Sequence, residues 1–321
     1  MKIAFVGKGG SGKTTLTALL ARHLAAQDRP VLAIDADINQ HLGVALGLDE
    51  GQAAALPAMG AHLDAIKAYL RGDNPRIRSA ASMVKTTPPG AGSRLLRLGQ
   101  PNPLSERLER RVGGVRLLAA GPFEGADLGV ACYHAKVGAV ELWLNHLLDG
   151  PGEYVLVDMT AGADAFASGL FTRFDRTFLV AEPTRQAVGV WRQYRAHADR
   201  FGVAVSVVGN KVHGDDDVAF LRRHVGEDLL VCLGHSAVVR AMEQGRALGP
   251  DALEGANRAA LARLRQAIDA TAKDWSRLQR LAVELHLRNA QAWANARTGE
   301  DLSVQIDPDF RLEQAARSAC A

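Results

Sequence analysis

The residues best suited to chemistry lie near the start of the chain, where glycines surround two lysines and two threonines. Gly7, Gly12, Lys13 and Thr14 fit the spacing G-x-x-x-x-G-K-[ST], which is typical of a loop that binds nucleotide phosphates. Glycines let successive backbone N–H groups turn inward around an anion, and a helix starting near Lys13 would point its positive end at the same anion. Lys13 would neutralise the β- and γ-phosphates, and the Thr14 hydroxyl would ligate Mg²⁺.

Acidic residues follow two apolar runs that are candidates for buried strands. Asp35 and Asp37 end the run that starts at Val31, and Asp158 comes directly after Tyr154–Val157. Ligands of α/β proteins bind at the carboxyl ends of parallel strands, so we expect these carboxylates in the same crevice as the phosphate loop. Asp158 is predicted to hold Mg²⁺ through water, because magnesium usually keeps several waters. Helix capping or an ordinary loop would also account for Asp35 and Asp37.

The elements that must position these residues alternate along the chain. Short apolar runs indicate strands buried on both faces, as in a parallel sheet covered by helices. The expected strands are Lys2–Val6, Val31–Ile34, Val115–Ala119, Tyr154–Val157, Thr177–Val180, Val203–Val208 and Leu229–Cys232. The expected helices are Leu16–Ala26, Lys136–Leu148, Arg185–Arg200, Asp217–His224 and Ser236–Gln244. This order predicts an α/β fold with a doubly wound, mostly parallel sheet.

Two regions depart from this alternation. Residues from about 49 to 114 hold an Ala-rich helical piece followed by the loop-like run Thr86–Gly92, which indicates a helical insertion between strands. Residues 251–321 are expected to form a helical C-terminal extension that ends in a loosely packed tail. The prediction is therefore one P-loop ATPase domain over residues 1–250, followed by this extension.

The run from Lys8 to Thr15, K-G-G-S-G-K-T-T, resembles the deviant Walker A motif KGGxGKTT. That motif marks the family of MinD, ParA, nitrogenase iron protein and the carbon monoxide dehydrogenase maturation factor CooC. The resemblance implies an ATP-hydrolysing switch that is a homodimer when ATP is bound, with Lys8 reaching across the interface to the partner's nucleotide. The residues implied to bind the nucleotide phosphates are Gly7, Gly9, Gly10, Ser11, Gly12, Lys13, Thr14 and Thr15.

The same resemblance implies roles for the acidic residues. Asp37 would orient or activate the attacking water, which makes it a catalytic residue together with Lys8 and Lys13. Asp35 would support the Mg²⁺ shell that Thr14 and Asp158 complete.

Two later segments resemble parts of the family that lie near the nucleotide. Asn210 and Lys211 end the run V-V-G-N-K, where the family uses an Asn to hydrogen-bond the adenine base. Glu182 and Pro183 begin the run E-P-T, which the family also places near the nucleotide. A turn without ligand contact is the alternative for this second run.

The order and spacing of the motifs resemble most those of CooC-type proteins, over roughly Met1 to Gly245. Those proteins carry a Cys-x-Cys pair ahead of the Walker B strand, and here that place reads Cys132-Tyr133-His134. One thiolate and one imidazole from each of two subunits would give a tetrahedral Cys₂His₂ set at a dimer interface, suited to Zn²⁺ and able to take Ni²⁺. A buried Cys132 with a capping or surface His134 is the alternative. The implied client is a protein in metallocofactor assembly or another client protein, which the sequence does not name.

Composition excludes several other classes. The chain has 321 residues, 47% of them hydrophobic, and a formal net charge of +3, so it is a globular protein and not a polycation. No apolar stretch approaches the roughly 20 residues of a membrane-spanning helix, and the tail lacks the apolar face of a membrane-docking helix. Three scattered cysteines favour the reducing cytoplasm.

Two other functions stay open at this point. A ParA-like or MinD-like ATPase that organises DNA or other cargo would need a basic face, although interleaved acids favour ordinary helix solvation and nucleic acid is not the expected partner. The arginines that could form such a face are Arg258, Arg263, Arg265, Arg277, Arg280 and Arg288. The third class is a P-loop synthetase or kinase that phosphorylates a small molecule. The Lys8 signature counts against this class.

Overall fold

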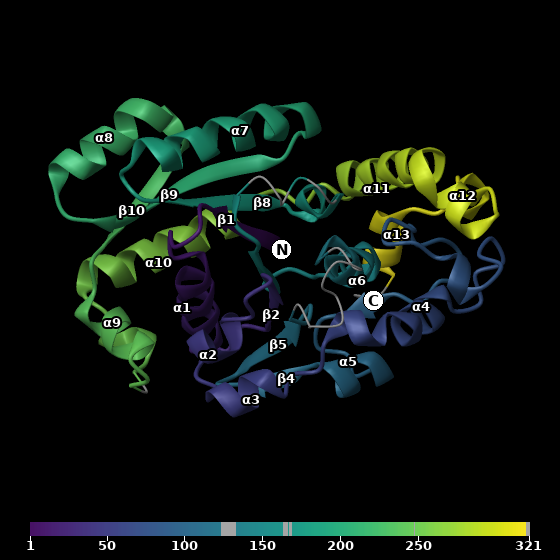
Figure 1. The fold of residues 1–321 in the computed structure, drawn as a ribbon, viewed down its shortest axis with the longest axis horizontal. Helices are drawn as coiled ribbons and strands as arrows, with labels where there is room; N and C mark the ends of the chain where they lie inside the picture. Colours follow the sequence, from purple (N-terminus) through teal and green to yellow (C-terminus); the bar gives the residue numbers. More distant parts are fainter. Residues whose placement is uncertain (123–132, 163–165, 167–168, 247, 319–321) are drawn as a thin grey trace.

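Eight strands of the described chain form one central sheet (Figure 1). The computed structural model describes residues 1–122, 133–162, 166, 169–246 and 248–318. The strand order is β10-β9-β8-β1-β7-β2-β5-β4, and within these residues all neighbours are parallel except β5 and β4. The strands are β1 Lys2–Gly7, β2 Val31–Ala36, β4 Arg110–Val112, β5 Val115–Ala119, β7 Tyr154–Met159, β8 Arg176–Ala181, β9 Ala204–Val212 and β10 Leu229–Gly234.

The predicted strands are all present, with bounds that differ by a few residues. β1, β2 and β7 are buried along their whole lengths, because layers of helices cover both faces of the sheet there. The edge strand β4 was not predicted. It forms a hairpin with β5 across Gly113 and Gly114, whose φ angles of 52° and 84° belong to a two-residue turn that only glycine adopts easily. A second, two-stranded sheet pairs β3 (Leu96–Arg97) with β6 (Leu147–Leu148).

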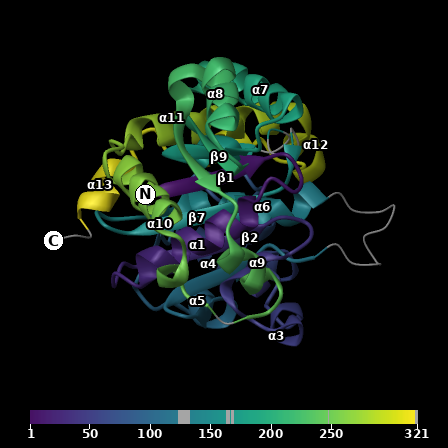
Figure 2. The ribbon, with the colours of Figure 1, turned by 90° about the vertical axis from the view of Figure 1, so that its left-hand side faces the viewer.

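Helices cover the sheet on both sides. On one face α1 (Lys13–Ala25) and α10 (Gly255–Asp269) pack Leu20 and Leu264 against β1 and β2. On the other face α6 (Tyr133–His146) and α7 (Arg185–Phe201) contribute Trp143 and Tyr194. Figure 2 shows α7 and α8 above β9 and β1, with α1 and α10 below them. The helices on the described chain are α1 Lys13–Ala25, α2 Leu42–Leu46, α3 Glu50–Ala54, α4 Leu63–Arg71, α5 Pro103–Leu108, α6 Tyr133–His146, α7 Arg185–Phe201, α8 Asp215–Val225, α9 Ala237–Glu243, α10 Gly255–Asp269, α11 Trp275–Asn289, α12 Asn295–Thr298 and α13 Leu312–Arg317. The predicted doubly wound α/β class is confirmed.

The C-terminal segment packs against the insertion between β2 and β5, at the opposite end of the molecule from α9 (Figure 1). Gln305 is 1% exposed, accepts a hydrogen bond from the Thr87 hydroxyl at 3.0 Å and donates one to the Ser82 carbonyl at 3.0 Å. The Asp307 carboxylate accepts from the Ala91 N–H at 2.9 Å. The expectation of a loosely packed tail is therefore wrong for this stretch. Its short polar sequence gives no local sign of packing, because the partners come from more than 200 residues away.

A buried ionic network joins Lys273, two residues before the start of α11, to the amino-terminal end of the sheet. The Lys273 ammonium lies 2.6 and 2.8 Å from the carboxylates of Asp149 and Asp175, which are 1% and 0% exposed in their side chains. The N-terminal amine of Met1 also pairs with Asp149, at 2.8 Å. Burial alone would raise the pKa of Asp149, but Lys273, the N-terminal amine and Lys2 outweigh it and hold that pKa well below its ordinary value.

Within the described ranges, no helix is long and apolar enough to cross a bilayer.

Candidate functional site

The loop between β1 and α1 has the shape that its glycines allow. Gly10 and Gly12 have φ angles of 77° and 95°, in the left-handed region that favours glycine. A side chain on Gly12 would also clash with the amide of Asn210. Gly12 is the N-cap of α1 and has no side chain to satisfy the first N–H groups of the helix, so these donors remain for an anion. The Lys13 ammonium donates to the Lys8 carbonyl at 3.3 Å, arching over this loop.

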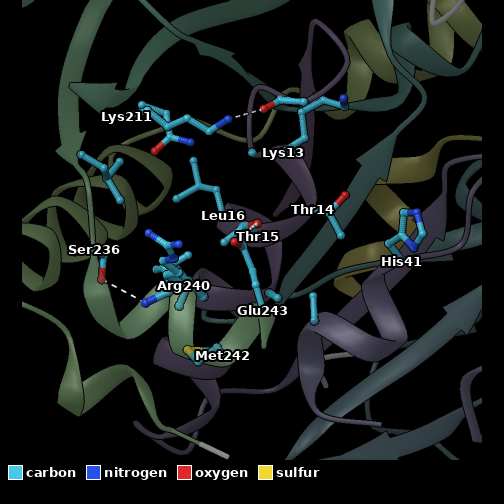
Figure 3. A pocket seen from close by; sticks show the side chains of 18 of the residues that line it. Lys13, Thr14, Thr15, Leu16, His41, Lys211, Ser236, Arg240, Met242 and Glu243 are labelled. Carbon is cyan, nitrogen blue, oxygen red and sulfur yellow. Dashed lines mark hydrogen bonds between the residues drawn. The ribbon is translucent and has the colours of Figure 1, made fainter. Parts of the chain in front are cut away.

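The loop borders a cavity of about 760 Å³ at the carboxyl ends of the strands (Figure 3). One wall is the loop with the start of α1. The others are the segment after β2, the end of β9, and α9, which follows β10. The lining residues that bear on function are Gly9, Gly10, Gly12, Lys13, Thr14, Thr15, Asp37, Asn39, His41, Asn210, Lys211, Ser236, Arg240 and Glu243. A crevice of this size, at this edge of a parallel sheet, suits a nucleotide.

The side chains of Asp158 and Thr14 are suited to bind a divalent cation. The Thr14 hydroxyl donates to Asp158 Oδ2 at 2.6 Å, joining α1 to the end of β7. Asp158 is fully buried, and its Oδ1 has no hydrogen-bond partner in the part of the chain that the structure describes. Burial raises the pKa of Asp158 to about 7, although the Thr14 hydroxyl and the Lys13 ammonium act in the opposite direction. A buried carboxylate with an oxygen left over, beside a hydroxyl, is a donor set that Mg²⁺ accepts.

Asp35 and Asp37 take different positions although they are two residues apart. Asp35 is 1% exposed, and its two oxygens accept the backbone N–H groups of Asp37 at 3.2 Å and Leu42 at 2.8 Å. Burial, and next the neighbouring carboxylate of Asp158, raise the pKa of Asp35 well above its ordinary value. Asp37 lines the cavity, and its Oδ1 accepts both the backbone and the side-chain N–H of Asn39 at 3.0 Å. Asp35 thus shapes the segment that presents Asp37 to the cavity.

Asn210 and Lys211 reach the phosphate loop from the end of β9. The Asn210 amide donates to the Ser11 carbonyl at 2.7 Å. The Lys211 ammonium donates to the Gly10 carbonyl at 2.7 Å and to Glu182 Oε1 at 2.8 Å. Glu182 therefore connects to the loop through Lys211. Neither Glu182 nor Pro183 is among the residues that line the cavity.

The sequence reasoning missed the wall that α9 forms. Ser236 caps this helix by accepting the Val239 N–H at 3.0 Å, and Arg240 and Glu243 then face the start of α1 (Figure 3). The Thr15 hydroxyl donates to Glu243 Oε1 at 3.3 Å. Ser236 comes two residues after the carboxyl end of β10, and that position was the available signal, since ligands bind there in α/β folds.

The pair predicted to bind a transition metal at a dimer interface, Cys132 and His134, is not described with its side chains. Cys132 lies outside the described residues, and of His134 only the backbone, at the start of α6, is described. Across the described ranges, no group of three or more His, Cys, Asp or Glu side chains could hold a metal ion. Lys8 is partly exposed, and its ammonium makes no hydrogen bond or ion pair with the described residues.

A comparison with protein families decides the classification. The profile of the CobQ/CobB/MinD/ParA nucleotide binding domain matches residues 3–248, which include the phosphate loop and the other functional lining residues named above. The chain belongs to this family. It is thus a member of a P-loop NTPase family, and the predicted resemblance to MinD and ParA is confirmed.

Among curated proteins, the chain is similar to the carbon monoxide dehydrogenase accessory protein CooC of Rhodospirillum rubrum. The two are 30% identical over 247 residues, which cover 76% of this chain and 87% of that protein. An uncharacterized ATP-binding protein of Methanocaldococcus jannaschii is 26% identical over 218 residues, covering 67% of this chain and 77% of its own length. The expected likeness to CooC is therefore confirmed.

Solved structures share the fold. The septum site-determining protein MinD from Pyrococcus horikoshii OT3, complexed with Mg-ADP, superimposes with a TM-score of 0.56 at 18% identity, covering 85% of this chain and 99% of that one. A ParA family ATPase from Chlorobium tepidum TLS gives a TM-score of 0.51 at 15% identity, covering 89% of this chain and 98% of its own.

Proposed function

We propose that this chain is an ATP-hydrolysing dimeric switch of the CooC kind, which assists a client protein in metallocofactor assembly. The observation that carries the proposal is the hydrogen bond from Thr14, which lines a nucleotide-sized cavity beside Lys13, to the buried Asp158 carboxylate. The family to which the chain belongs, and its likeness to CooC, support the nucleotide and the kind of client.

The residues would divide the work as follows. Backbone N–H groups of Gly9 to Thr14 would hold the phosphate oxygens, and Lys13 would turn its ammonium from the Lys8 carbonyl to the β- and γ-phosphates. Thr14 and Asp158 would hold Mg²⁺, which neutralises charge on the phosphates when it is bound. The Asp37 carboxylate would orient the attacking water through Oδ2, because Asn39 already occupies Oδ1.

At the other end of the cavity, Asn210 would exchange its bond to the Ser11 carbonyl for one to the adenine base. Lys211 holds the loop through Gly10, with Glu182 as its counter-ion. Asp35 would act as a positioning residue, since both of its oxygens are bound to the backbone that carries Asp37.

Dimerisation and metal binding form the remaining part of the proposal. Lys8 would contact the partner's nucleotide, which agrees with its partly exposed position in the loop. Cys132 and His134 from two subunits would form a Cys₂His₂ site for Zn²⁺ or Ni²⁺ near the two-fold axis.

A DNA-organising role finds less support. Arg265 and Arg288 pair with acids of their own helices, at 3.3 and 2.6 Å. Arg258 donates to backbone carbonyls, and Arg277 donates to the Phe174 carbonyl at 2.8 Å. Each of these four arginines of the expected basic face thus has at least one partner within the chain. The test is retention of the protein on non-specific DNA. Retention that falls with rising salt would support the DNA-organising role.

Calorimetry with ATP, with and without Mg²⁺, tests the nucleotide site. Lys13→Ala should weaken ATP affinity by roughly 10- to 100-fold, the equivalent of one charge-assisted contact. Lys67→Ala, on α4 and away from the cavity, is the matched control and should bind like the wild type. Equal affinity of wild type and Lys13→Ala would overturn the assignment. Turnover of ATP in the absence of any added acceptor separates an ATPase from a small-molecule kinase.

A further inference from the structure

A second cavity, of about 320 Å³, shares no lining residue with the nucleotide cavity. Its apolar wall consists of Phe166 and Phe171 from the segment after β7, Phe201 at the end of α7, and Leu285 on α11. Lys85 and Arg288 complete the lining that matters here. We call these six residues and the space between them the aromatic pocket.

The rings of the aromatic pocket form one continuous surface. The Phe166 and Phe171 centroids are 5.0 Å apart in an edge-to-face arrangement, and those of Phe171 and Phe201 are 5.2 Å apart in the same manner. All three phenylalanines are half-buried, so each keeps part of its ring toward the pocket. Edge-to-face rings leave faces and edges on which another apolar group can stack.

Two cations at the aromatic pocket have donors to spare. Lys85 Nζ lies 4.0 Å from Glu141 Oε2, which is too long for a hydrogen bond, and the described residues offer its ammonium no other partner. Arg288 gives one hydrogen bond to Glu284, at 2.6 Å, out of the five N–H groups of a guanidinium. Its guanidinium also lies 5.9 Å from the Phe201 ring centroid, which keeps the charge beside the apolar wall.

Glu141, on α6, lies behind the aromatic pocket. The side chain is fully buried, and neither carboxyl oxygen has a hydrogen-bond partner within the described part of the chain. Burial raises the pKa of Glu141, while Lys85 and Arg173 act in the opposite direction. An added side chain at Gly169, which also lines the pocket, would clash with Glu141 Oε1, so this carboxyl lies directly behind the pocket wall.

We propose that the aromatic pocket binds a small organic carboxylate whose body is an aromatic ring or a branched apolar chain. The ring wall would bury the body, and Lys85 and Arg288 would pair with the carboxylate. The cavity volume is at the lower end of the range of small-molecule sites, which suits one ring with a short acidic arm. The site is additional to the proposed ATPase function and does not depend on it.

The test uses the full chain without nucleotide, so its result is independent of the nucleotide cavity. Calorimetry measures 3-phenylpropionate against three relatives: 3-phenylpropylamine, 3-phenylpropanol and propionate. We expect 3-phenylpropionate to bind at least tenfold more tightly than each of the others. Equal binding of the carboxylate and the amine would overturn the charge assignment. No binding of any probe to folded protein would overturn the site.

Matched variants locate the binding. Ala292 is exposed and lines the pocket, whereas its neighbour Gln291 is exposed and does not. Ala292→Trp should weaken 3-phenylpropionate at least tenfold, and Gln291→Trp should leave it unchanged. Arg288→Gln should weaken the carboxylate but not the alcohol, with Arg280→Gln on the same helix as its control. Wild-type affinity in Ala292→Trp would place the probe elsewhere and overturn the proposal.

Discussion

Removing the charge of Lys273 should destabilise the whole fold, because two buried carboxylates depend on it. In Lys273→Met, Asp175 would keep the hydrogen bond from the Lys2 N–H at 2.7 Å, and Asp149 would keep the N-terminal amine at 2.8 Å and the more distant Lys2. Removing one partner of a buried ion pair costs about 3–5 kcal/mol. Because Asp149 keeps other cations, we expect the free energy of unfolding to fall by about 3 kcal/mol at pH 7.

The pH dependence of this loss identifies its cause. The folded pKa of Asp149 lies below its unfolded value, so the stabilisation is complete above about pH 4 and is lost as pH falls toward the folded pKa. The difference in free energy of unfolding between wild type and Lys273→Met should therefore become smaller below about pH 4.

Urea unfolding followed by circular dichroism, at pH 7 and at low pH, measures both quantities. Arg263→Met, at an exposed position of α10, is the control and should change stability by less than about 0.5 kcal/mol. A loss below about 1 kcal/mol at pH 7, or a gap that widens in acid, would refute the reasoning.

Two further outcomes follow from the structure. Asp37→Ala should bind ATP like the wild type but turn it over roughly 100-fold more slowly or worse, in a steady-state phosphate-release assay; unchanged turnover would remove Asp37 from catalysis. Gln305→Ala should lower the free energy of unfolding by about 2 kcal/mol, because the Thr87 hydroxyl and the Ser82 carbonyl lose their buried partner. Gln314→Ala, which is exposed, is its control, and equal losses in the two variants would show that the tail does not contribute through Gln305.

Local sequence was sufficient for the sheet and the phosphate loop. Each buried strand is a short apolar run, and the glycines at 10 and 12 have the backbone angles that the motif requires. These features depend on neighbours in sequence, which a reader of the sequence can see. The hairpin at Gly113-Gly114 was missed, although two adjacent glycines before an apolar run are its signal.

Features that depend on distant residues could not be predicted in the same way. Gln305 is polar, and only its partners in the insertion explain its burial. Asp35 directs both of its oxygens to backbone N–H groups, which depends on how the segment after β2 folds back. Glu243 reaches Thr15 across 228 positions of sequence. Such contacts come from topology and not from any local pattern.

The central claim, an ATP-driven dimer, is tested most directly by light scattering on Asp37→Ala with no nucleotide, with ADP and with ATP·Mg²⁺. We predict twice the monomer mass only with ATP·Mg²⁺, and a monomer when Lys8→Ala is added to the same chain. A single mass in all three states, or a dimer that forms equally well without Lys8, would contradict the account.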